Sequence, residues 1–248
     1  MAQTSSIEWT ESTWNPVTGC TKISAGCQNC YAERMARRLK AMRVPAYRQG
    51  FSLAVHPGVL DAPRKWKKPR TIFVNSMSDL FHERVPLEFI QQVFAVMNEC
   101  SQHIFQILTK RPHLAAEYAQ RLTWSENIWM GTTVENALVA DRVGFLRTIP
   151  AAIRFLSVEP LLGAIPRLPV SGLDWVVVGG ESGPGARPMQ ADWVRQIRDR
   201  CGVYGVPFFF KQWGGANKKK NGRLLDGRIW DEMPCVELCS GPLSGSTA

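Results

Sequence analysis

Three cysteines lie close together near the start of the chain, at Cys20, Cys27 and Cys30. Their spacing is C-x6-C-x2-C, within the segment WNPVTGCTKISAGCQNCYAERMARR. Soft thiolates so near one another in sequence suit iron-sulfur or zinc ligation. Gly19 and Gly26 would let the backbone fold around a metal. Cys30 stands where a helix is expected to begin, and a helix amino terminus favours negative thiolates.

A structural zinc site is the alternative use of these cysteines, with His56, His82 or a distant cysteine as the fourth ligand. Structural zinc sites are usually closed by four protein ligands, and no paired fourth ligand lies nearby in the sequence. Three cysteines would instead leave one iron of a four-iron cluster open to a substrate or cofactor. We therefore favour an iron-sulfur cluster.

The other cysteines have weaker claims to a metal. Cys100 and Cys201 each end an apolar helical pattern, so we interpret them as core or surface thiols. Cys235 and Cys239 have a C-x3-C spacing that could bind a second metal, but they lie in a polar tail, and we favour the inert interpretation.

Short apolar, β-rich runs recur along the chain and alternate with helical patterns. The runs are TIFVNS, HIFQILTK, NIWMGTT, IRFLSVE, DWVVVGG and PFFFKQW. Between them lie PLEFIQQVFAVMNEC, HLAAEYAQRL, NALVADRVGFLRTI and ADWVRQIRDRCG, with apolar residues at three- and four-residue spacing. This alternation predicts parallel strands joined by crossover helices. Either a doubly wound sheet or a barrel would cover such strands on both faces.

Polar residues gather directly after the apolar runs, in NSMSD, LTKRP, GTTVEN, SVEP, GGESG and KQWGG. In barrels this edge is where sites are built, which favours a partial TIM-type (β/α)6-like parallel barrel. We expect one domain over residues 1–234, with an irregular proline-bearing excursion at 44–70 over the barrel mouth, and a flexible tail at 235–248.

The chain has 248 residues and 30 Lys and Arg against 21 Asp and Glu, a formal charge of +9. This excess favours an anionic partner such as nucleic acid, although a solvated surface also accounts for it.

No long apolar stretch and no secretory signal is visible, so we expect no membrane association and a cytoplasmic location. The odd number of cysteines fits a reducing compartment.

Taken together, the motifs resemble the phage Gp37/Gp68-like family, which looks like a divergent branch of the radical S-adenosylmethionine superfamily. The resemblance covers WNPVTGC, FVNSMSDLF, LTKRP, GTTVEN, SVEPLLG, GGESG, FFKQWGG and LLDGRIWDEMP. Two features depart from the usual superfamily signature. The first gap between cysteines is six residues rather than three, and the aromatic Tyr31 follows the last cysteine rather than preceding it.

The resemblance implies a radical SAM-like barrel, a [4Fe-4S] cluster on the three cysteines, and S-adenosylmethionine on the open iron. Reductive cleavage of S-adenosylmethionine would generate a 5'-deoxyadenosyl radical that abstracts hydrogen. An electron donor such as flavodoxin or ferredoxin would supply the electron. The residues expected from their positions to bind S-adenosylmethionine are Asn75, Ser76, Asp79, Lys110, Thr132, Thr133, Glu135, Gly179 and Gly180.

Glu159, Glu181 and Lys211 are the candidate catalytic residues on the substrate side. Capping of strand ends would explain each polar residue singly, but so many charges at one edge are costly without a ligand.

Tryptophans such as Trp9 and Trp66 accompany basic segments such as RKWKKPR, a mixture found in nucleic-acid proteins and in cores alike.

Within the superfamily the pattern looks closest to spore photoproduct lyase, which implies DNA-lesion repair or nucleic-acid base modification, with DNA the favoured partner. Two alternatives remain at this point. One is a non-catalytic, zinc-stabilised nucleic-acid-binding protein, and the other is a radical enzyme that acts on a small metabolite. No Walker loop, zinc-protease helix or serine nucleophile elbow is present, and GGESGPGARP lacks the spacing of a dinucleotide fingerprint, so hydrolysis and hydride transfer rank low.

Overall fold

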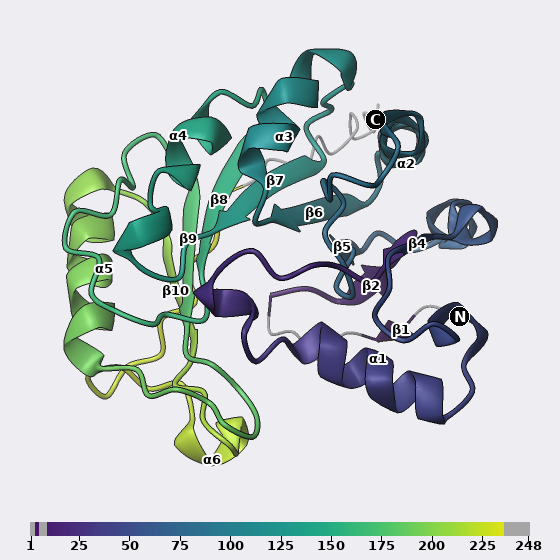
Figure 1. Cartoon of the computed structure of the whole chain (residues 1–248). Coiled ribbons are helices and arrows are strands. Elements are labelled where there is room, and N and C mark those ends of the chain that lie inside the picture. Colours follow the sequence, from purple (N-terminus) through teal and green to yellow (C-terminus); the bar gives the residue numbers. More distant parts are fainter. Residues whose placement is uncertain (1–2, 5–8, 236–248) are drawn as a thin grey trace, which may run out of the picture.

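The main structural feature is a sheet of eight strands that curls into a half-barrel (Figure 1). The computed structural model describes residues 3–4 and 9–235. The strand order is β1-β2-β5-β6-β7-β8-β9-β10, in which β1 is antiparallel to β2 and the other neighbours are parallel. Its strands are β1 (Gln3–Thr4), β2 (Ser12–Trp14), β5 (Thr71–Val74), β6 (Ile104–Thr109), β7 (Ile128–Thr133), β8 (Ile153–Val158), β9 (Trp175–Gly179) and β10 (Phe208–Gln212). The expected partial parallel barrel is therefore confirmed.

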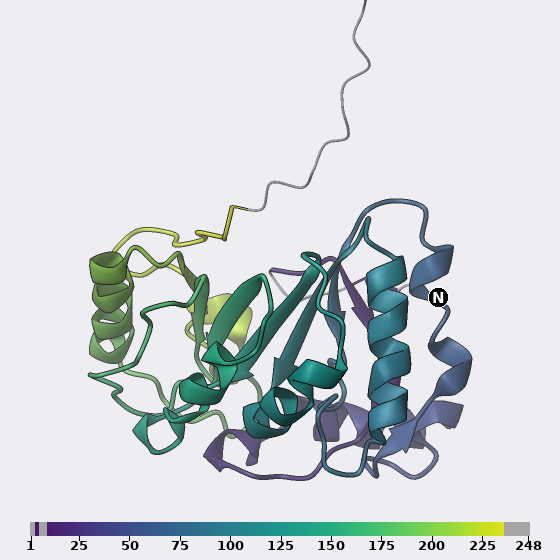
Figure 2. The same ribbon diagram turned by 90° about the horizontal axis from the view of Figure 1, so that it is seen from above.

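Helices connect most of these strands. They are α1 (Tyr31–Ala41), α2 (Leu87–Glu99), α3 (Pro112–Tyr118), α4 (Arg142–Arg147), α5 (Ala191–Tyr204) and the short α6 (Lys218–Asn221). Figure 2 shows the strands between α2 and α5. Each of the six apolar runs contains a strand, but the helical pattern at 136–149 yields only the short α4. The Asn136 side chain accepts a hydrogen bond from the Leu138 amide and starts a separate 3-10 turn at Ala137–Val139, which delays the helix.

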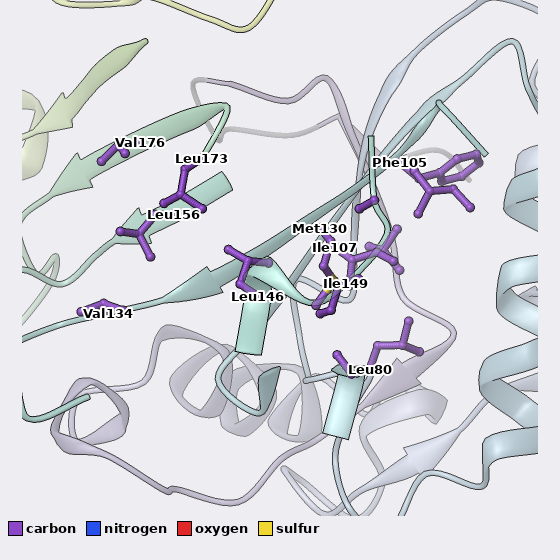
Figure 3. Close-up of a cluster of buried hydrophobic side chains, with 14 of the residues drawn as sticks. Leu80, Phe105, Ile107, Met130, Val134, Leu146, Ile149, Leu156, Leu173 and Val176 are labelled. Carbon is purple, nitrogen blue, oxygen red and sulfur yellow. The ribbon is translucent and has the colours of Figure 1, made fainter. Parts of the chain in front are cut away.

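The convex face of the sheet carries the main core, because every second strand residue points toward the helices. Phe105, Ile107, Met130, Leu156 and Val176 are buried there, together with residues of the covering elements (Figure 3). Burying one such side chain contributes about 1.5–3 kcal/mol before entropy is counted. This core fixes the sheet on which the site is built.

The concave face is lined near its base by aromatic rings. Trp9, Trp129, Phe155, Trp175 and Phe209 form one buried cluster with edge contacts such as Trp9 to Trp175, 5.8 Å between ring centroids. Two of the tryptophans are core residues, since Trp9 is 5% exposed and Trp14 is 2% exposed. Trp9 is therefore not placed to stack on an external base.

The segment at 44–70, which we expected over the barrel mouth, is built from short elements. These are 3-10 turns at Pro45–Tyr47, Pro57–Val59 and Pro63–Lys65, and the strand β4 (Ala54–Val55), which pairs with β3 (Val17–Thr18). Its first half lies beside the cysteines, since the Cys20 amide donates to the Phe51 carbonyl. Its second half reaches the opposite edge of the sheet, where Pro63 contacts His103 just before β6.

The boundary of the expected tail falls at the end of the described chain. Cys235 is exposed and is a free thiol, whereas Cys239 lies outside the described residues, as do residues 236–248. In the described part of the chain, no helix combines the length and the apolar character that crossing a membrane requires.

Candidate functional site

The carboxyl ends of the parallel strands form the edge at which the candidate residues gather. Alternation along each strand directs Lys110, Thr133, Glu159 and Lys211 to the same concave side as the aromatic cluster, but nearer the mouth. A contact confirms part of this arrangement, because Lys110 Nζ lies 3.4 Å from Thr133 Oγ1. The predicted gathering of polar residues at this edge is therefore present in the structure.

The three cysteines lie on the connection from β2 to α1, which we call the cysteine loop (residues 19–30). Gly19 begins it with φ +79°, and a Cβ there would lie 2.2 Å from the Ser52 carbonyl oxygen. Only glycine can adopt this backbone conformation at such a close approach without strain. The amide of Gly19 also donates to the Met77 carbonyl, so the loop leaves the sheet edge beside the end of β5.

The thiols of the cysteine loop are partly exposed and lie in different electrostatic surroundings. Burial and the nearby Asp79 carboxylate raise the pKa of Cys20 to about 11, although Arg111 acts against them. Burial also raises the pKa of Cys27, but the charge of Lys110 and hydrogen bonds at Ile23 and Ser24 outweigh it, so the pKa is lowered. The Cys27 thiolate is thus the easier of these two to form.

These thiols fit an iron-sulfur cluster in donor type and in position, since soft sulfur donors stand on one loop at the mouth of the half-barrel. Within residues 3–4 and 9–235, however, no three His, Cys, Asp or Glu side chains are grouped closely enough to hold a metal ion. Cluster binding would therefore require the cysteine loop to draw its thiols together.

The first of three charged groups that hold the cysteine loop is centred on Arg111, which is 3% exposed. Its guanidinium donates to Cys20 Sγ at 3.5 Å, to Asp79 Oδ2 at 3.2 Å and to Glu83 Oε2 at 2.6 Å. It also donates to Thr21 Oγ1 at 2.8 Å. Asp79 accepts further bonds from the Thr109 hydroxyl and the Lys110 amide, so its oxygens already have partners.

The second group is centred on Glu135, whose side chain is fully buried. It accepts from the Gly26 amide at 3.1 Å and from Arg142 at 2.9 Å. Burial raises the pKa of Glu135, but hydrogen bonds and the cations Lys110 and Arg142 outweigh burial and lower it. An ionised Glu135 therefore joins the middle of the cysteine loop to the start of α4.

The third group pairs Glu181 with Arg187, 2.5 Å apart. Arg187 also donates to the Ala25 carbonyl at 3.0 Å and to Gln28 Oε1 at 3.2 Å, and Asn29 Nδ2 donates to Glu181 at 2.9 Å. Burial raises the pKa of Glu181, but the bonds from Arg187 and Asn29 outweigh it and lower the pKa to about 2. We call the three groups together the loop anchors.

Several residues expected to bind S-adenosylmethionine also have structural partners. Asn75 Oδ1 accepts from the Val17 amide at 3.1 Å, and Ser76 Oγ donates to Asn15 at 3.1 Å. Thr132 Oγ1 donates to the Thr109 carbonyl at 2.9 Å. A Cβ on Gly180 would lie 2.1 Å from the Trp213 carbonyl oxygen, so close backbone packing alone explains why this residue is glycine. Their roles toward the cofactor stay predictions.

Glu159 and Lys211 form a separate pair across the far half of the edge. Lys211 Nζ donates to both Glu159 oxygens, at 2.8 and 2.9 Å, and Gln212 Nε2 reaches Glu159 Oε1 at 3.3 Å. A Cβ on Gly179 would lie 3.2 Å from Glu159 Cδ, so Gly179 leaves space beside the carboxylate. This pair has none of the hydrogen bonds that join the loop anchors to the cysteine loop.

The two histidines considered as zinc ligands are engaged elsewhere. His56 Nε2 lies 2.8 Å from Thr18 Oγ1, and His82 Nε2 lies 3.0 Å from Thr21 Oγ1. The other ring nitrogen of His82 accepts from the Arg84 amide at 3.1 Å. Neither imidazole is part of a three-ligand group with the cysteines in the portion of the chain that is described.

Sequence reasoning missed the three arginines of the loop anchors, Arg111, Arg142 and Arg187. The signal was present for two of them, because Arg111 belongs to the LTKRP motif and Arg187 closely follows GGESG. Each acid at the sheet edge requires a cation if it is buried, and an arginine nearby in sequence is the natural source. Arg142 lies within a predicted helix and outside the polar motifs that follow the strands, so the sequence does not indicate its role.

Comparison with known proteins places this chain in a family and in a fold. The chain belongs to the family described as "Protein of unknown function (DUF5131)", which matches residues 4–234. The match does not carry the Gp37/Gp68 name. No curated protein matches the sequence.

Solved structures of spore photoproduct lyase share the fold. A complex with dinucleoside spore photoproduct has a TM-score of 0.52 at 12% identity, covering 83% of this chain and 65% of that one. A point mutant has a TM-score of 0.58 at 10% identity, covering 86% of this chain and 79% of that one. A double mutant with bound AdoMet and dinucleoside spore photoproduct has a TM-score of 0.51 at 12% identity, covering 83% and 65%. This chain thus spans just under two thirds of the first of these.

Proposed function

We propose that this protein is a radical S-adenosylmethionine enzyme that acts on nucleic acid. The observation that carries the proposal is the position of the C-x6-C-x2-C loop, at the carboxyl-end edge of a half-barrel with the fold of spore photoproduct lyase. Structures of that lyase hold AdoMet and a dinucleoside photoproduct. DNA-lesion repair or base modification is the activity we assign, with a flavodoxin or ferredoxin as electron donor.

In this proposal Cys20, Cys27 and Cys30 hold a [4Fe-4S] cluster. When bound, the cluster and S-adenosylmethionine supply radical hydrogen abstraction. The loop anchors orient the cysteine loop over the half-barrel, and Lys110 presents a positive charge beside Thr133 at the mouth. The buried aromatic cluster beneath excludes water from the base of the concave face.

The far half of the mouth is the proposed substrate side. Glu159 and Lys211 are mutually paired there, with 21% and 12% of their side chains exposed, so a substrate group that displaced one partner would meet the other. A carboxylate and an ammonium so placed can accept and donate hydrogen bonds to a polar substrate edge. Glu181 contributes indirectly through its hold on Arg187.

The test is anaerobic purification with iron, sulfide and zinc analysis, followed by electron paramagnetic resonance of the reduced protein with and without S-adenosylmethionine. We expect about four irons per chain and a signal that S-adenosylmethionine perturbs. Cys27→Ala should lose the iron, whereas Cys235→Ser, at an exposed cysteine outside the loop, should keep it. Stoichiometric zinc without iron would overturn the proposal.

A further inference from the structure

The helix α1 differs from the other long helices in what it covers. Its buried residues Ala32 and Ala36 belong to a small separate cluster with Tyr47 and Met77, whereas α2 and α5 contribute to the main core. Figure 1 shows α1 (purple) lying apart from the helices that line the sheet. Because α1 begins directly after Cys30, and Arg34 in its first turn donates to the Ser182 carbonyl, the start of α1 adjoins the mouth of the half-barrel.

The outward face of α1 is strongly basic. Residues 31–50 contain six Arg and Lys and one acid, Glu33. Glu33 is already held by Lys22 at 2.9 Å and Arg37 at 2.6 Å. We call the exposed cations of this stretch the α1 basic face, which consists of Arg37, Arg38, Lys40, Arg43 and Arg48. Among the described residues, no carboxylate pairs with the last four of these.

The basic face borders a hollow that is lined by polar residues and by Pro45, Ala46, Gly50 and Ala54. This hollow of about 250 Å³ follows α1, and its polar lining residues are Arg48, Gln49, Ser52 and His56. The side chain of Lys40 lies at its rim, since a Cβ on Gly50 would be 3.6 Å from Lys40 Cδ. The Arg48 guanidinium, the Gln49 amide and the Ser52 hydroxyl are suitable donors for a phosphate, whereas the His56 ring is already hydrogen-bonded to Thr18.

The other basic segment, RKWKKPR at 64–70, is different in both location and pairing. Arg64 is paired with Glu99 at 2.6 Å and with Asp61. Arg70 lies over the Trp66 ring at 5.2 Å and stands one residue before β5 begins. This segment is therefore at the amino-end edge of the sheet, opposite the candidate site. Of the two basic segments, only the α1 basic face is next to the mouth.

We propose that the α1 basic face is the docking surface for the phosphate backbone of a single nucleic-acid strand that enters the site. Exposed cations on the outward half of α1 and on the segment after it, with no free acid among them, suit an extended polyanion, and each neutralised phosphate releases counterions. Tyr31, 58% exposed at the start of α1, offers an aromatic ring on which a base can stack. This inference rests on the proposed function, because it supplies the substrate of the same site.

The test is fluorescence anisotropy with a labelled oligodeoxythymidine, measured over a series of salt concentrations. The variant Arg38→Glu/Lys40→Glu/Arg48→Glu reverses three exposed cations of the α1 basic face. The control Lys65→Glu/Lys67→Glu/Lys68→Glu makes the same charge change at the opposite edge, where all three lysines are also exposed. Circular dichroism melting of both variants checks that each is folded.

We expect the α1 variant to bind the strand at least ~10-fold more weakly, and the slope of log K against log salt to fall by about 2, as the loss of three phosphate contacts predicts. The control variant should bind like the wild type. Equal losses in both variants, or a loss in the control alone, would overturn the proposal. So would unchanged strand binding in the α1 variant with impaired reduction by flavodoxin, which would assign the face to an acidic protein.

Failure of this inference can be told from failure of the proposed function, because strand binding and metal content are measured separately. If the protein contains iron and the α1 variant binds the strand as tightly as the wild type, only the proposed docking surface is refuted. Zinc-loaded protein whose strand binding depends on the α1 basic face would refute only the enzyme.

Discussion

Two groups of charged side chains share the carboxyl-end edge of the sheet, and they differ in what they contact. In the loop anchors, Asp79 is joined to the cysteine loop through Arg111, Glu135 accepts directly from the Gly26 amide, and Glu181 is joined to the loop through Arg187 and Asn29. Glu159 and Lys211, in the far half of the edge, contact each other and Gln212. Charged side chains at this edge therefore occur in two arrangements: one group holds the cysteine loop, and the other is paired within itself in the far half of the edge.

The comparison is tested most strongly at Arg111. Arg111→Met leaves the 6% exposed Asp79 without its cation, and we expect the free energy of unfolding to fall by about 3–5 kcal/mol. Urea unfolding measures this, and adding Asp79→Asn should restore part of the loss. Arg167→Met, at an exposed arginine, is the control and should change stability by no more than about 0.5 kcal/mol. A loss below about 1 kcal/mol at Arg111 would mean that this anchor does not hold the loop.

Gly179, the last residue of β9, and Gly180, which follows it, test whether a glycine is required by backbone packing or leaves space beside a side chain. Gly180→Ala places a Cβ 2.1 Å from a backbone oxygen, so we expect a loss of about 1–3 kcal/mol in thermal unfolding. Gly179→Ala meets the side chain of Glu159, which can move, and should cost less. Equal losses would show that Gly179 is as tightly packed as Gly180 and leaves no space beside Glu159.

The Glu181 anchor predicts a pH dependence. Its pKa of about 2 in the folded protein lies below the ordinary value of 4.5, so its contribution is complete above pH 4.5 and is lost as the pH falls toward 2. Glu181→Gln should therefore be less stable than the wild type by about 1–3 kcal/mol at neutral pH, and the difference should shrink in acid. Glu88→Gln, at an exposed residue of α2, should show no such trend. A difference independent of pH would contradict the ionised anchor.

The smallest effect on stability is expected at the far pair. Lys211→Met leaves Glu159 with Gln212 and partial exposure, so the loss should be about 1 kcal/mol, and iron content should be unchanged. Iron analysis and urea unfolding of the same sample check both. Loss of iron in this variant would place the pair among the loop anchors and would end the distinction between the two regions.

Much of the fold was accessible from the sequence, because buried parallel strands leave uninterrupted apolar runs and their crossover helices leave a helical period. The six runs became β5 to β10 in order. The gathering of polar residues at one edge also followed, since parallel strands all end on the same side. The shortened α4 could not be read in this way, because the side-chain bond of Asn136 decides where the turn begins.

The sequence by itself determined the parallel strands with their crossover helices and the edge at which a site would form, and it favoured a partial barrel over a doubly wound sheet. Only the tertiary structure decided which acids meet which arginines, because Arg111 and Arg187 reach the cysteine loop from the connections after two different strands, and Arg142 is joined to it only through Glu135. It also decided that the two basic segments lie at opposite edges of the sheet. The pattern of a strand involves residues that are neighbours in the sequence, so it can be recognised there. The charge pairs join residues from different parts of the chain, which come within bonding distance only when the sheet folds.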